Sequence, residues 1–550
     1  SNADDGQGSS AAESSAASDS SISAGASQET SAAGITYPLS QDSSIVLTVG
    51  VTASDYVTDY ENNYLTNKLE EVSGVTIQAE VFPATDATTK LTLMVTGGQE
   101  LPDILTFGTD TNTRNTYADA GVLVALDDYF ADSAMSQPFL DRCAEVGFEP
   151  DYVLNQLRSL DGSIYAMPTY DYKPTNVYCN RAYINQDWLD TLGLSQPTTL
   201  DELTEVLIAF RDKDPNGNGQ RDEVPMSGMY SYTSNSCSLN WLQSLFIYND
   251  LTANRYLPLS ETDGKIDVAY DKEAYREFLK YVNMLISENL LDEAVLTQSL
   301  SDMRAQLQTE VQTIGMMTGS ASGFGDNLAS WQPIQQPVGY NGLQQVTAKS
   351  TGIGARWCIT TFCEYPELAF QLGMACYEDD SLLLSARYGE EGVDWRYAEE
   401  GEESIFGDAI TPNLCVINPV WGDVSNQLWQ AEILPGLCSS NTFVEVFDGN
   451  KLYGEYLHGQ SVAKNMDFGP AEEDIVGTIL YTEEESDRWN EVRSTINTYV
   501  EEARALFCVG QLDPNSDSDW NNYLAELEKM NYKEMLEADT IAYKRTYGIQ

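Results

Sequence analysis

The sequence predicts a mixed α/β protein, because strand-like and helix-like segments alternate where recognisable secondary structure begins. The predicted segments are a strand over 45–51, a helix over 62–72, a strand over 75–81, a helix over 87–95 and a strand over 102–107. Leu65, Leu69 and Val72 share one face of the first helix, whereas apolar and polar residues alternate in the second strand. This order requires parallel strands joined by helical crossovers. A chain of 550 residues is long enough for two or three domains.

Ahead of this α/β region lies a segment with almost nothing to bury. Residues 4–33 consist almost entirely of Ser, Ala, Gly, Asp, Glu and Gln, without an aromatic residue. Such a composition cannot offset the entropy cost of ordering, so we predict a disordered tether over 1–40. Residues 1–3 resemble the remnant of a cleaved tag. In bacterial lipoproteins a tether of this kind follows a lipid-modified cysteine, so we expect a lipid anchor on the cytoplasmic membrane and an extracellular location.

The composition is strongly acidic. Lys and Arg number 29 against 85 Asp and Glu, which gives a formal net charge of −56. A surface this negative repels phosphate backbones and anionic membranes, so we expect no nucleic-acid partner. The sequence contains no run of 18 apolar residues, and it therefore predicts no membrane-spanning helix.

The histidine and cysteine content excludes several kinds of site. The single histidine, His458, argues against Ser-His-Asp or Cys-His hydrolases and against zinc sites built on several histidines, and we expect it to be a surface or packing residue. Nine cysteines form no CxxC pair, and the spacing of Cys358 and Cys363 fits no metal or redox motif. Their odd number leaves at least one thiol unpaired within the chain, while the disulfide state of the others stays open.

The segment 161–203 links two predicted strands through a polar and aromatic connector. A short strand over 164–167 ends at Pro168, a second strand covers 177–179, and the connector between them carries Tyr170 and Tyr172. A helix with Trp188 follows. Two strands joined in this way belong either to two lobes with the connector as crossing point or to one ordinary domain, and the pattern alone leaves both open.

This segment resembles the central signature of the extracellular solute-binding proteins of ABC-type sugar importers, and specifically the large, lipoprotein-type oligosaccharide-binding group. The matching positions are Gly162, Tyr165, Pro168, Tyr178, Asn180, Trp188, Leu189, Leu192, Gly193, Leu194, Pro197, Thr199, Glu202 and Leu203. Similar stretches at 98–104, 388–395 and 520–547 extend the resemblance over nearly everything after residue 45. Residues 313–325 predict a strand that enters a glycine-rich loop, and the resemblance implies that this loop borders the ligand cleft.

The resemblance implies a two-lobed periplasmic-binding-protein-like fold of the type II class, with a hinge between the lobes and a helical C-terminal region. Lobe 1 would comprise residues 41–169 and about 348–415. Lobe 2 would comprise residues 175–345 and about 416–550.

Residues 212–223 form a candidate calcium loop. Oxygen-bearing side chains recur at alternate positions and glycine stands at the bend, as a short Ca²⁺ loop requires. One frame has the ligands Asp214, Asn216, Asn218, the Gln220 carbonyl, Asp222 and Glu223, with Gly219 in the sixth position. The other has Asp212, Asp214, Asn216, the Asn218 carbonyl and Glu223, with Gly217 in the sixth position. A solvated acidic turn is the remaining alternative. Some members of the resembling group carry a similar structural calcium loop, which favours the first frame.

For function, the resemblance implies an extracellular binding lipoprotein, expected to be a monomer, that closes over a solute and delivers it to the permease subunits of an ABC transporter. The chain has 9 Trp and 32 Tyr, and aromatic rings stack on sugar rings, so an oligosaccharide is the first choice of ligand. Candidate ligand-binding residues at predicted strand ends, crossovers and loops are Tyr170, Tyr172, Trp241, Trp357 and Trp395. Peptides, amino-sugar polymers and uronates remain alternative ligands.

Two other functions stay open at this point. A secreted glycan hydrolase or lyase needs two positioned carboxylates, but among 85 acidic residues no motif singles out such a pair, so we expect no enzyme. A glycan sensor or adhesin without an import role has the same sequence features as a transporter component.

Overall fold

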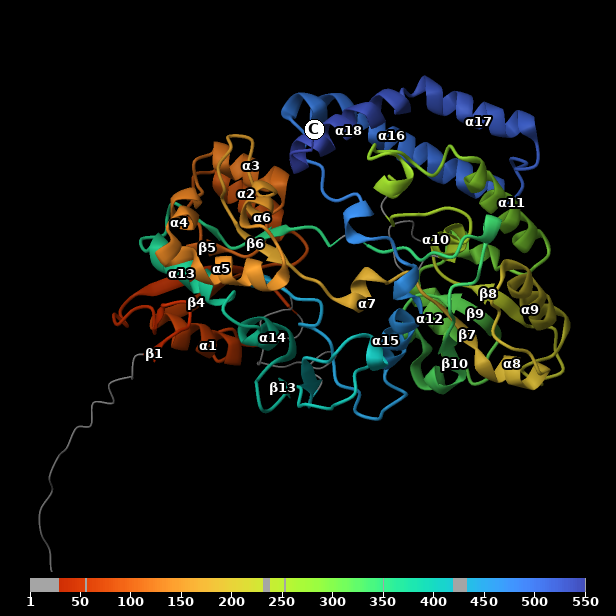
Figure 1. Ribbon diagram of the computed structural model, residues 1–550, viewed down its shortest axis with the longest axis horizontal. Coiled ribbons are helices and arrows are strands. Elements are labelled where there is room, and N and C mark those ends of the chain that lie inside the picture. The colour runs from red at the N-terminus through yellow and green to blue at the C-terminus, as the bar shows by residue number, and fades with distance from the viewer. Residues whose placement is uncertain are drawn as a thin grey trace, which may run out of the picture.

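The computed structural model describes residues 29–54, 57–230, 238–251, 254–349, 351–418 and 433–549. Two lobes lie side by side along the longest axis, and the short helix α7 (Pro174–Val177) lies between them (Figure 1). The two-lobed α/β fold expected from the sequence is therefore present. The part of the predicted tether over residues 1–28 lies outside the described residues.

Lobe 1 is built around a four-stranded sheet with the order β12-β5-β3-β4. Its strands are β3 (Val46–Thr52), β4 (Thr76–Phe82), β5 (Ile104–Leu105) and β12 (Cys358–Ile359). Strand β3 pairs in parallel with β4 and β5, and β12 is antiparallel to β5. Helices α1 (Tyr64–Ser73) and α2 (Ala87–Thr96) provide the expected crossovers. The alternating strand and helix segments predicted near the start of the chain are confirmed.

Lobe 2 is built around a second four-stranded sheet, with the order β10-β7-β9-β8. Its strands are β7 (Ala182–Asn185), β8 (Val224–Ser227), β9 (Ile314–Thr318) and β10 (Trp331–Pro333), and its helices include α8 (Gln186–Leu192), α9 (Leu200–Asp212), α10 (Ser238–Ser244), α11 (Glu273–Ser287) and α12 (Leu300–Leu307). Gly315 of β9 allows α9 to pack closely, because a Cβ atom there would lie 2.3 Å from the ring of Phe210.

A third sheet, with the order β11-β6-β15, contains the strands next to the crossing segments. It consists of β6 (Met167–Tyr170), β11 (Gly354–Arg356) and β15 (Gly436–Leu437). The strand predicted over 177–179 is wrong: Pro174 begins α7, in which the N–H of Tyr178 donates to the Pro174 carbonyl, and the next strand starts at Ala182. The predicted lobe boundary at 415/416 stays a prediction, and the pairing of β15 with β6 favours a later crossing.

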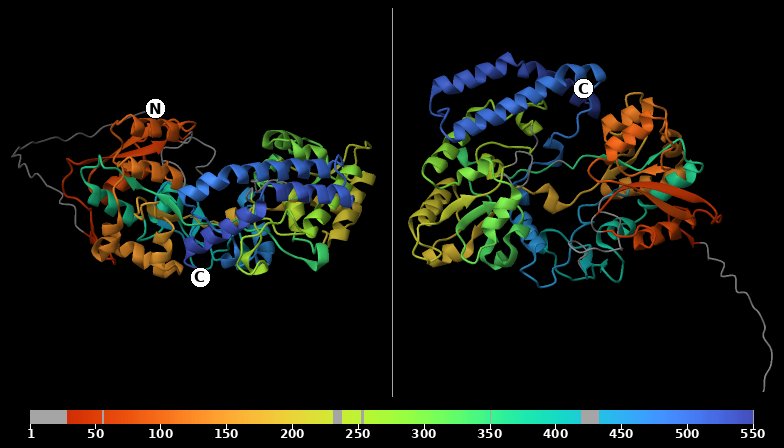
Figure 2. Two further views of the ribbon diagram at one scale, coloured as in Figure 1. Left: turned by 90° about the horizontal axis from the view of Figure 1, so that it is seen from above. Right: turned by 180° about the vertical axis from the view of Figure 1, so that it is seen from behind.

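The remaining regular elements complete the two lobes. In lobe 1 they are α3 (Thr111–Asp119), α4 (Asp127–Ala131), α5 (Ser133–Val146), α6 (Pro150–Asn155), α13 (Pro366–Ala375), α14 (Ser381–Tyr388), β13 (Trp395–Tyr397) and β14 (Leu414–Val416). The last helices are α15 (Gly454–Asn465), α16 (Glu483–Cys508), α17 (Asp517–Lys529) and α18 (Tyr532–Tyr547). Helices α16 to α18 lie along lobe 2, and the chain end returns toward lobe 1 (Figure 2).

Residues 29–40 do not belong to a disordered tether, which corrects the predicted end of that segment. Strands β1 (Glu29–Thr30) and β2 (Thr36–Tyr37) form a small antiparallel sheet. The Ser31 hydroxyl donates a 2.6 Å hydrogen bond to Glu378, and the Leu39 N–H donates to the Val72 carbonyl. These contacts attach the segment to lobe 1.

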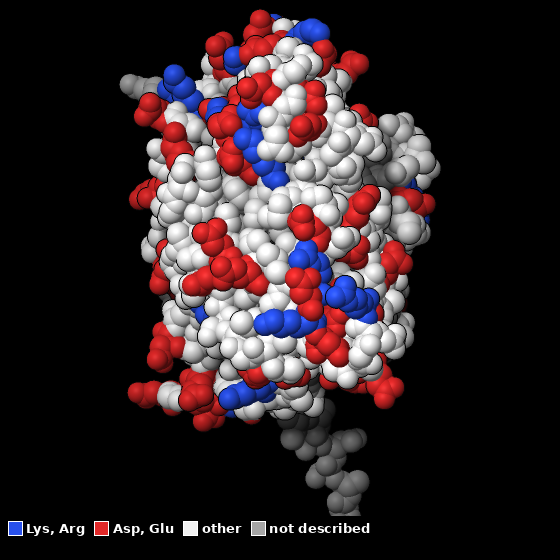
Figure 3. Space-filling view, turned by 90° about the vertical axis from the view of Figure 1, so that its right-hand side faces the viewer, with Lys and Arg blue, Asp and Glu red and all other residues white. Residues whose placement is uncertain are grey.

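Three further findings concern the cysteines, the surface charge and the length and apolar character of the helices. The eight cysteines of the described residues form no disulfide with one another, and all but Cys415 are buried. Acidic side chains outnumber basic ones over the outer face of lobe 2, in agreement with the net charge (Figure 3). Within the described ranges, no helix combines the length and apolar character needed to cross a bilayer.

Candidate functional site

Three cavities lie where the two lobes meet. The aromatic cavity, of about 300 Å³, is lined by Phe148, Tyr152, Gln156, Tyr170, Thr351, Gly352, Ile353, Glu472, Glu473, Ile475, Gly477, Tyr543, Tyr547 and Ile549. The polar cavity, of about 590 Å³, shares Gln156, Thr351, Gly352 and Ile353 with it, so the two adjoin. The α15 cavity, of about 380 Å³, is lined by Lys173, Ser320, Leu328, Arg387, Tyr388, Val416, Glu445, Tyr453, Gly454, Glu455 and His458. All three combine residues from segments far apart in the sequence.

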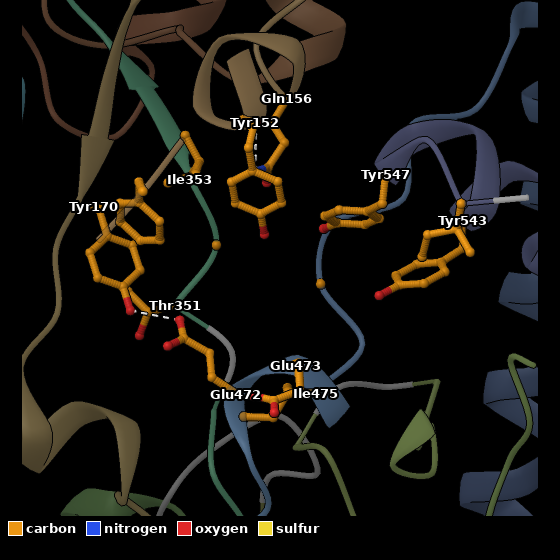
Figure 4. Close-up of a pocket in the computed structure, with 14 residues that line it drawn as sticks. Tyr152, Gln156, Tyr170, Thr351, Ile353, Glu472, Glu473, Ile475, Tyr543 and Tyr547 are labelled. Carbon is orange, nitrogen blue, oxygen red and sulfur yellow. Dashed lines mark hydrogen bonds between the residues drawn. The ribbon is translucent and has the colours of Figure 1, made fainter. Parts of the chain in front are cut away.

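The aromatic cavity brings tyrosines of lobe 1 opposite tyrosines of the last helix (Figure 4). Tyr152 of α6 and Tyr547 of α18 have ring centroids 6.1 Å apart, tilted by 35°. A Cβ atom at Gly477 would lie 2.3 Å from the Tyr547 hydroxyl, so this glycine provides the room for the Tyr547 ring. Tyr170 donates a 2.8 Å hydrogen bond to Glu472. Burial, supported by this hydrogen bond, raises the pKa of Tyr170, which remains a neutral donor.

The polar cavity is lined by charged groups with unused hydrogen-bonding capacity. Arg356 Nη2 contacts Asp171 Oδ2 at 2.7 Å, and the Thr169 hydroxyl donates to the same carboxylate. Arg114 donates to the Thr109 and Leu157 carbonyls, and burial lowers its pKa. Nε of Arg114 and Nη1 of Arg356 are buried and have no hydrogen-bond partner among the described residues. Buried donors of this kind are costly unless a water or ligand oxygen accepts from them.

The α15 cavity contains two glutamates in different electrostatic environments. Glu445 is 3% exposed and accepts from the hydroxyls of Tyr388 and Tyr453, and burial raises its pKa. Glu455 lies 3.6 Å from Lys173 Nζ. Burial acts in the opposite direction, but the charge of Lys173 and the hydrogen bond to His458 hold the pKa of Glu455 well below its usual value. The cavity therefore holds one carboxylate whose pKa is raised and one whose pKa is lowered.

The predicted ligand-binding aromatics divide into two groups. Tyr170 lines the aromatic cavity, and Tyr172 stacks on it with ring centroids 6.0 Å apart, where burial raises the pKa of Tyr172 to about 12. Trp241, Trp357 and Trp395 are 2%, 0% and 0% exposed, respectively. The indoles of Trp357 and Trp395 donate to the Ala369 and Gly389 carbonyls. The structure therefore places all three tryptophans in the packed interior and not on the cavity walls.

Sequence reasoning did not single out most residues that line the cavities. Tyr543 and Tyr547 are four residues apart on α18, so the helical period puts them on one face. That spacing was the available signal. Asp171 and Arg356 are brought together only by the antiparallel pairing of β6 and β11, which no local pattern reveals.

The candidate calcium loop forms a compact turn whose side-chain oxygens accept hydrogen bonds from within the loop. Asp222 accepts from the side-chain amides of Asn216 and Asn218 at 3.1 and 2.9 Å, and the Asp214 carboxylate accepts from the N–H groups of Asn218 and Gly219. Oε1 of Glu223 is buried without a hydrogen-bond partner. Burial, followed by the charges of Asp222 and Asp214, raises the pKa of Glu223.

These features test whether the loop suits a cation. An unpartnered buried carboxylate oxygen in a loop with two further carboxylates suits a hard divalent cation, which would supply the missing partner once the loop closed around it. Asp212, by contrast, pairs with Arg211 at 2.8 Å, and this pairing favours the frame that starts at Asp214. In the described ranges, no three or more His, Cys, Asp or Glu side chains are gathered closely enough to form a metal centre.

Comparisons with known proteins agree with the fold. The bacterial extracellular solute-binding protein family matches residues 54–357. The chain is 25% identical to the fructooligosaccharide ABC transporter substrate-binding protein FusA of Streptococcus pneumoniae serotype 4, over 94% of this chain and 91% of FusA. It resembles the crystal structure of an extracellular solute-binding protein from Bifidobacterium longum subsp. infantis, with a TM-score of 0.72 and 20% identity over 94% of this chain and all of that one.

FusA itself has been solved in two relevant forms. Its complex with kestose has a TM-score of 0.68 and 21% identity to this chain, covering 92% of this chain and all of the FusA chain. A FusA EF-hand mutant in complex with fructo-nystose matches with the same TM-score, identity and coverage.

Proposed function

Because the chain belongs to the bacterial extracellular solute-binding protein family, we propose that it captures a solute between its two lobes and delivers it to an ABC permease. The observation that carries this proposal is the junction of the lobes, where cavities with unpartnered buried donors combine residues from both. Members of this family are binding proteins, so the specific function depends on which ligand this chain binds.

An oligosaccharide fits the chemistry of the junction best. Sugar hydroxyls accept from guanidinium groups and donate to carboxylates, and the polar cavity is lined by the Arg356–Asp171 pair and by Arg114. Sugar C–H faces stack on aromatic rings, and the adjoining cavity offers Tyr152 and Tyr547. The similarity to FusA along nearly its whole length makes fructo-oligosaccharides the first class to test.

The proposed mechanism is hinge closure. A ligand that contacts both lobes shifts the population toward a closed form, by as much as its affinity differs between the open and closed forms. The crossing segments beside α7, at Lys349 and Thr351, and at Glu472 would absorb the rotation, since they connect the two lobes. The permease would then recognise the closed form.

A structural calcium ion is part of the proposal. It would be held by Asp214, Asn216, Asn218, the Gln220 carbonyl, Asp222 and Glu223. The ion would pair with the buried Glu223 oxygen and relieve the repulsion among the three carboxylates. The EF-hand mutant of FusA supports testing calcium in this chain.

We also propose a monomeric, extracellular lipoprotein tethered through its N-terminal segment to the cytoplasmic membrane. In this arrangement the attachment of residues 29–40 to lobe 1 would leave lobe 2 free to rotate about the hinge.

The test is a thermal-shift screen with kestose, nystose, maltotriose, chitotriose and a tripeptide, each with calcium and with a chelator. A ligand at 100 times its Kd adds about 2.7 kcal/mol to the free energy of unfolding. We expect a fructo-oligosaccharide to raise Tm in the wild type and to lose most of that effect in Arg356→Gln. A folded protein whose Tm no sugar changes would contradict the proposal, and a shift with the tripeptide alone would redirect it to peptides.

A further inference from the structure

The only histidine of the chain lies at the lobe junction and not on the surface. His458 is carried by α15, is 7% exposed and lines the α15 cavity. The sequence alone suggests a surface or packing role for it. Its hydrogen bonds indicate a more specific one.

Both ring nitrogens of His458 have partners. Nε2 accepts a 2.9 Å hydrogen bond from the N–H of Ala321 and lies 3.3 Å from the Ser320 hydroxyl. Nδ1 lies 3.2 Å from Glu455 Oε1. A backbone N–H can only donate, so Nε2 must present its lone pair, and Nδ1 carries the proton that Glu455 accepts. The geometry therefore requires the neutral imidazole with its proton on Nδ1.

An ion pair extends these contacts to the crossing segment. The second carboxylate oxygen of Glu455 lies 3.6 Å from Lys173 Nζ, and Lys173 directly precedes α7. At the other end, the loop after β9, Gly319 and Ser320, leads into a 3₁₀ helix over Ala321–Ser330, and Ser320 lies at the cavity wall. Lys173, Glu455, His458 and Ala321 thus form one chain of contacts from the crossing segment to that loop.

We propose that His458 is a positioning residue whose neutral imidazole holds the loop after β9 against the α15 cavity, so that protonation of this one side chain releases the loop and weakens ligand capture in acid. The part about ligand capture rests on the proposed function. The part about the loop does not depend on any ligand.

The charges around His458 agree with this role. Burial and the charge of Arg181, which precedes β7, lower the pKa of His458, whereas Glu455 on its own helix raises it and Lys173 lowers it further. The net direction is downward from 6.5. A group whose pKa is lowered on folding contributes stability that is complete above its unfolded pKa and is lost as pH falls through the folded pKa. The contact with Ala321 should therefore be intact near pH 7.5 and be lost progressively below pH 6.5.

A neighbouring carboxyl group acts in the opposite direction. Burial raises the pKa of Glu445, so its ionised form destabilises the fold at neutral pH and acid relieves that cost. Glu445 contacts Tyr388 and Tyr453 rather than the imidazole. A comparison of pH profiles between variants separates the two groups.

The experiment uses the full chain with ¹⁵N-labelled histidine in saturating calcium. Because there is one histidine, its two ring ¹⁵N signals are assigned directly. We expect the Nδ1–H tautomer at pH 7.5, a transition below pH 6.5 and faster amide exchange at Ala321, after correction for intrinsic rates, once the ring is protonated. An Nε2–H tautomer, or exchange at Ala321 that does not follow the transition, would overturn the proposal.

Ligand affinity gives the second readout. For a fructo-oligosaccharide that binds, we expect Kd to rise about tenfold between pH 7.5 and a pH below the observed transition of the ring, the scale of one hydrogen bond to a charged or buried group. His458→Gln keeps an acceptor for Ala321 without a titrating ring, so its ratio of Kd values at the two pH values should fall to about two. Glu445→Gln should keep the wild-type ratio.

An equal ratio in wild type and His458→Gln would overturn the proposal. Failure of every sugar to bind at pH 7.5 would reject the proposed function and leave the tautomer and exchange results to decide the loop contact.

Discussion

The Tyr170 hydroxyl donates a 2.8 Å hydrogen bond to Oε1 of Glu472, a residue 302 positions further along the chain. Tyr170 ends β6, and Glu472 begins a short 3₁₀ turn ahead of the C-terminal helices. The bond therefore joins two crossing segments inside the aromatic cavity (Figure 4). Any rotation of the lobes must either preserve this bond or break it.

Replacing Tyr170 by Phe should affect both stability and ligand affinity. The ring remains and only the hydrogen bond is lost, so we expect the free energy of unfolding to fall by about 1 kcal/mol. We also expect Kd for a bound oligosaccharide to rise about fivefold. Urea unfolding and isothermal titration calorimetry measure the two effects. Tyr397→Phe removes a hydroxyl outside the three cavities and is the control for affinity; equal behaviour of the two variants would refute the role of this bond.

Calcium should stabilise the wild type. The two loop frames differ in which variant is expected to lose this stabilisation. If the frame starts at Asp214, Asp222→Asn should abolish the rise in Tm on adding calcium, because a carboxylate ligand is lost. Asp212→Asn should keep it, since Asp212 pairs with Arg211 outside the ligand set. Differential scanning calorimetry with calcium and with chelator measures both. Loss of the calcium effect in Asp212→Asn and not in Asp222→Asn would establish the other frame.

A buried carboxylate attaches the last helix to lobe 2. Asp539 is 0% exposed, pairs with Arg493 of α16, and accepts from the hydroxyls of Tyr256 and Tyr481 at 3.0 and 2.9 Å. Asp539→Ala should lower the free energy of unfolding by about 3–5 kcal/mol, because it leaves the Arg493 charge without its partner in a largely buried site.

The control for Asp539 lies on the same helix. Glu537 is exposed, so Glu537→Ala should change stability by no more than about 0.5 kcal/mol. Denaturant unfolding followed by far-UV circular dichroism measures both variants. A small effect of Asp539→Ala would mean that α18 is not held by this network.

Tryptophans in the interior and tyrosines in the cavity should respond differently to truncation. Trp395→Ala should cost about 3–5 kcal/mol of stability, since it empties a fully buried site and removes the hydrogen bond to Gly389. Tyr547→Ala should cost less stability and weaken ligand binding more, because this ring lines the aromatic cavity. Unfolding and calorimetric titration of each variant give the comparison. A selective loss of binding in Trp395→Ala would instead indicate that Trp395 belongs to the ligand site.

The alternation of strands and helices could be predicted from the sequence because local periodicity determines it. Leu65 and Leu69 recur at helical spacing and are fully buried in the core of lobe 1. The connector was less predictable: Val177 and Cys179 have strand-like residue types, but Pro174 begins a helical turn there. Propensity is a weak guide where tertiary contacts decide.

The site was the least predictable part for the same reason. Trp357 lies beside a predicted strand end, yet its indole reaches the Ala369 carbonyl inside lobe 1. Tyr152 and Tyr547 are almost 400 positions apart in the sequence and meet only through the packing of α18 near lobe 1. Local patterns identify which residue types are available, and only the long-range arrangement determines which of them share a cavity.

The central claim is that one oligosaccharide is captured between the two lobes and closes them. Small-angle X-ray scattering of the wild type, with and without a saturating sugar identified by the thermal screen, tests it without labels. We predict a smaller radius of gyration with the sugar at an unchanged monomeric mass. An unchanged radius of gyration, under conditions where calorimetry reports one-to-one binding, would contradict capture by lobe closure.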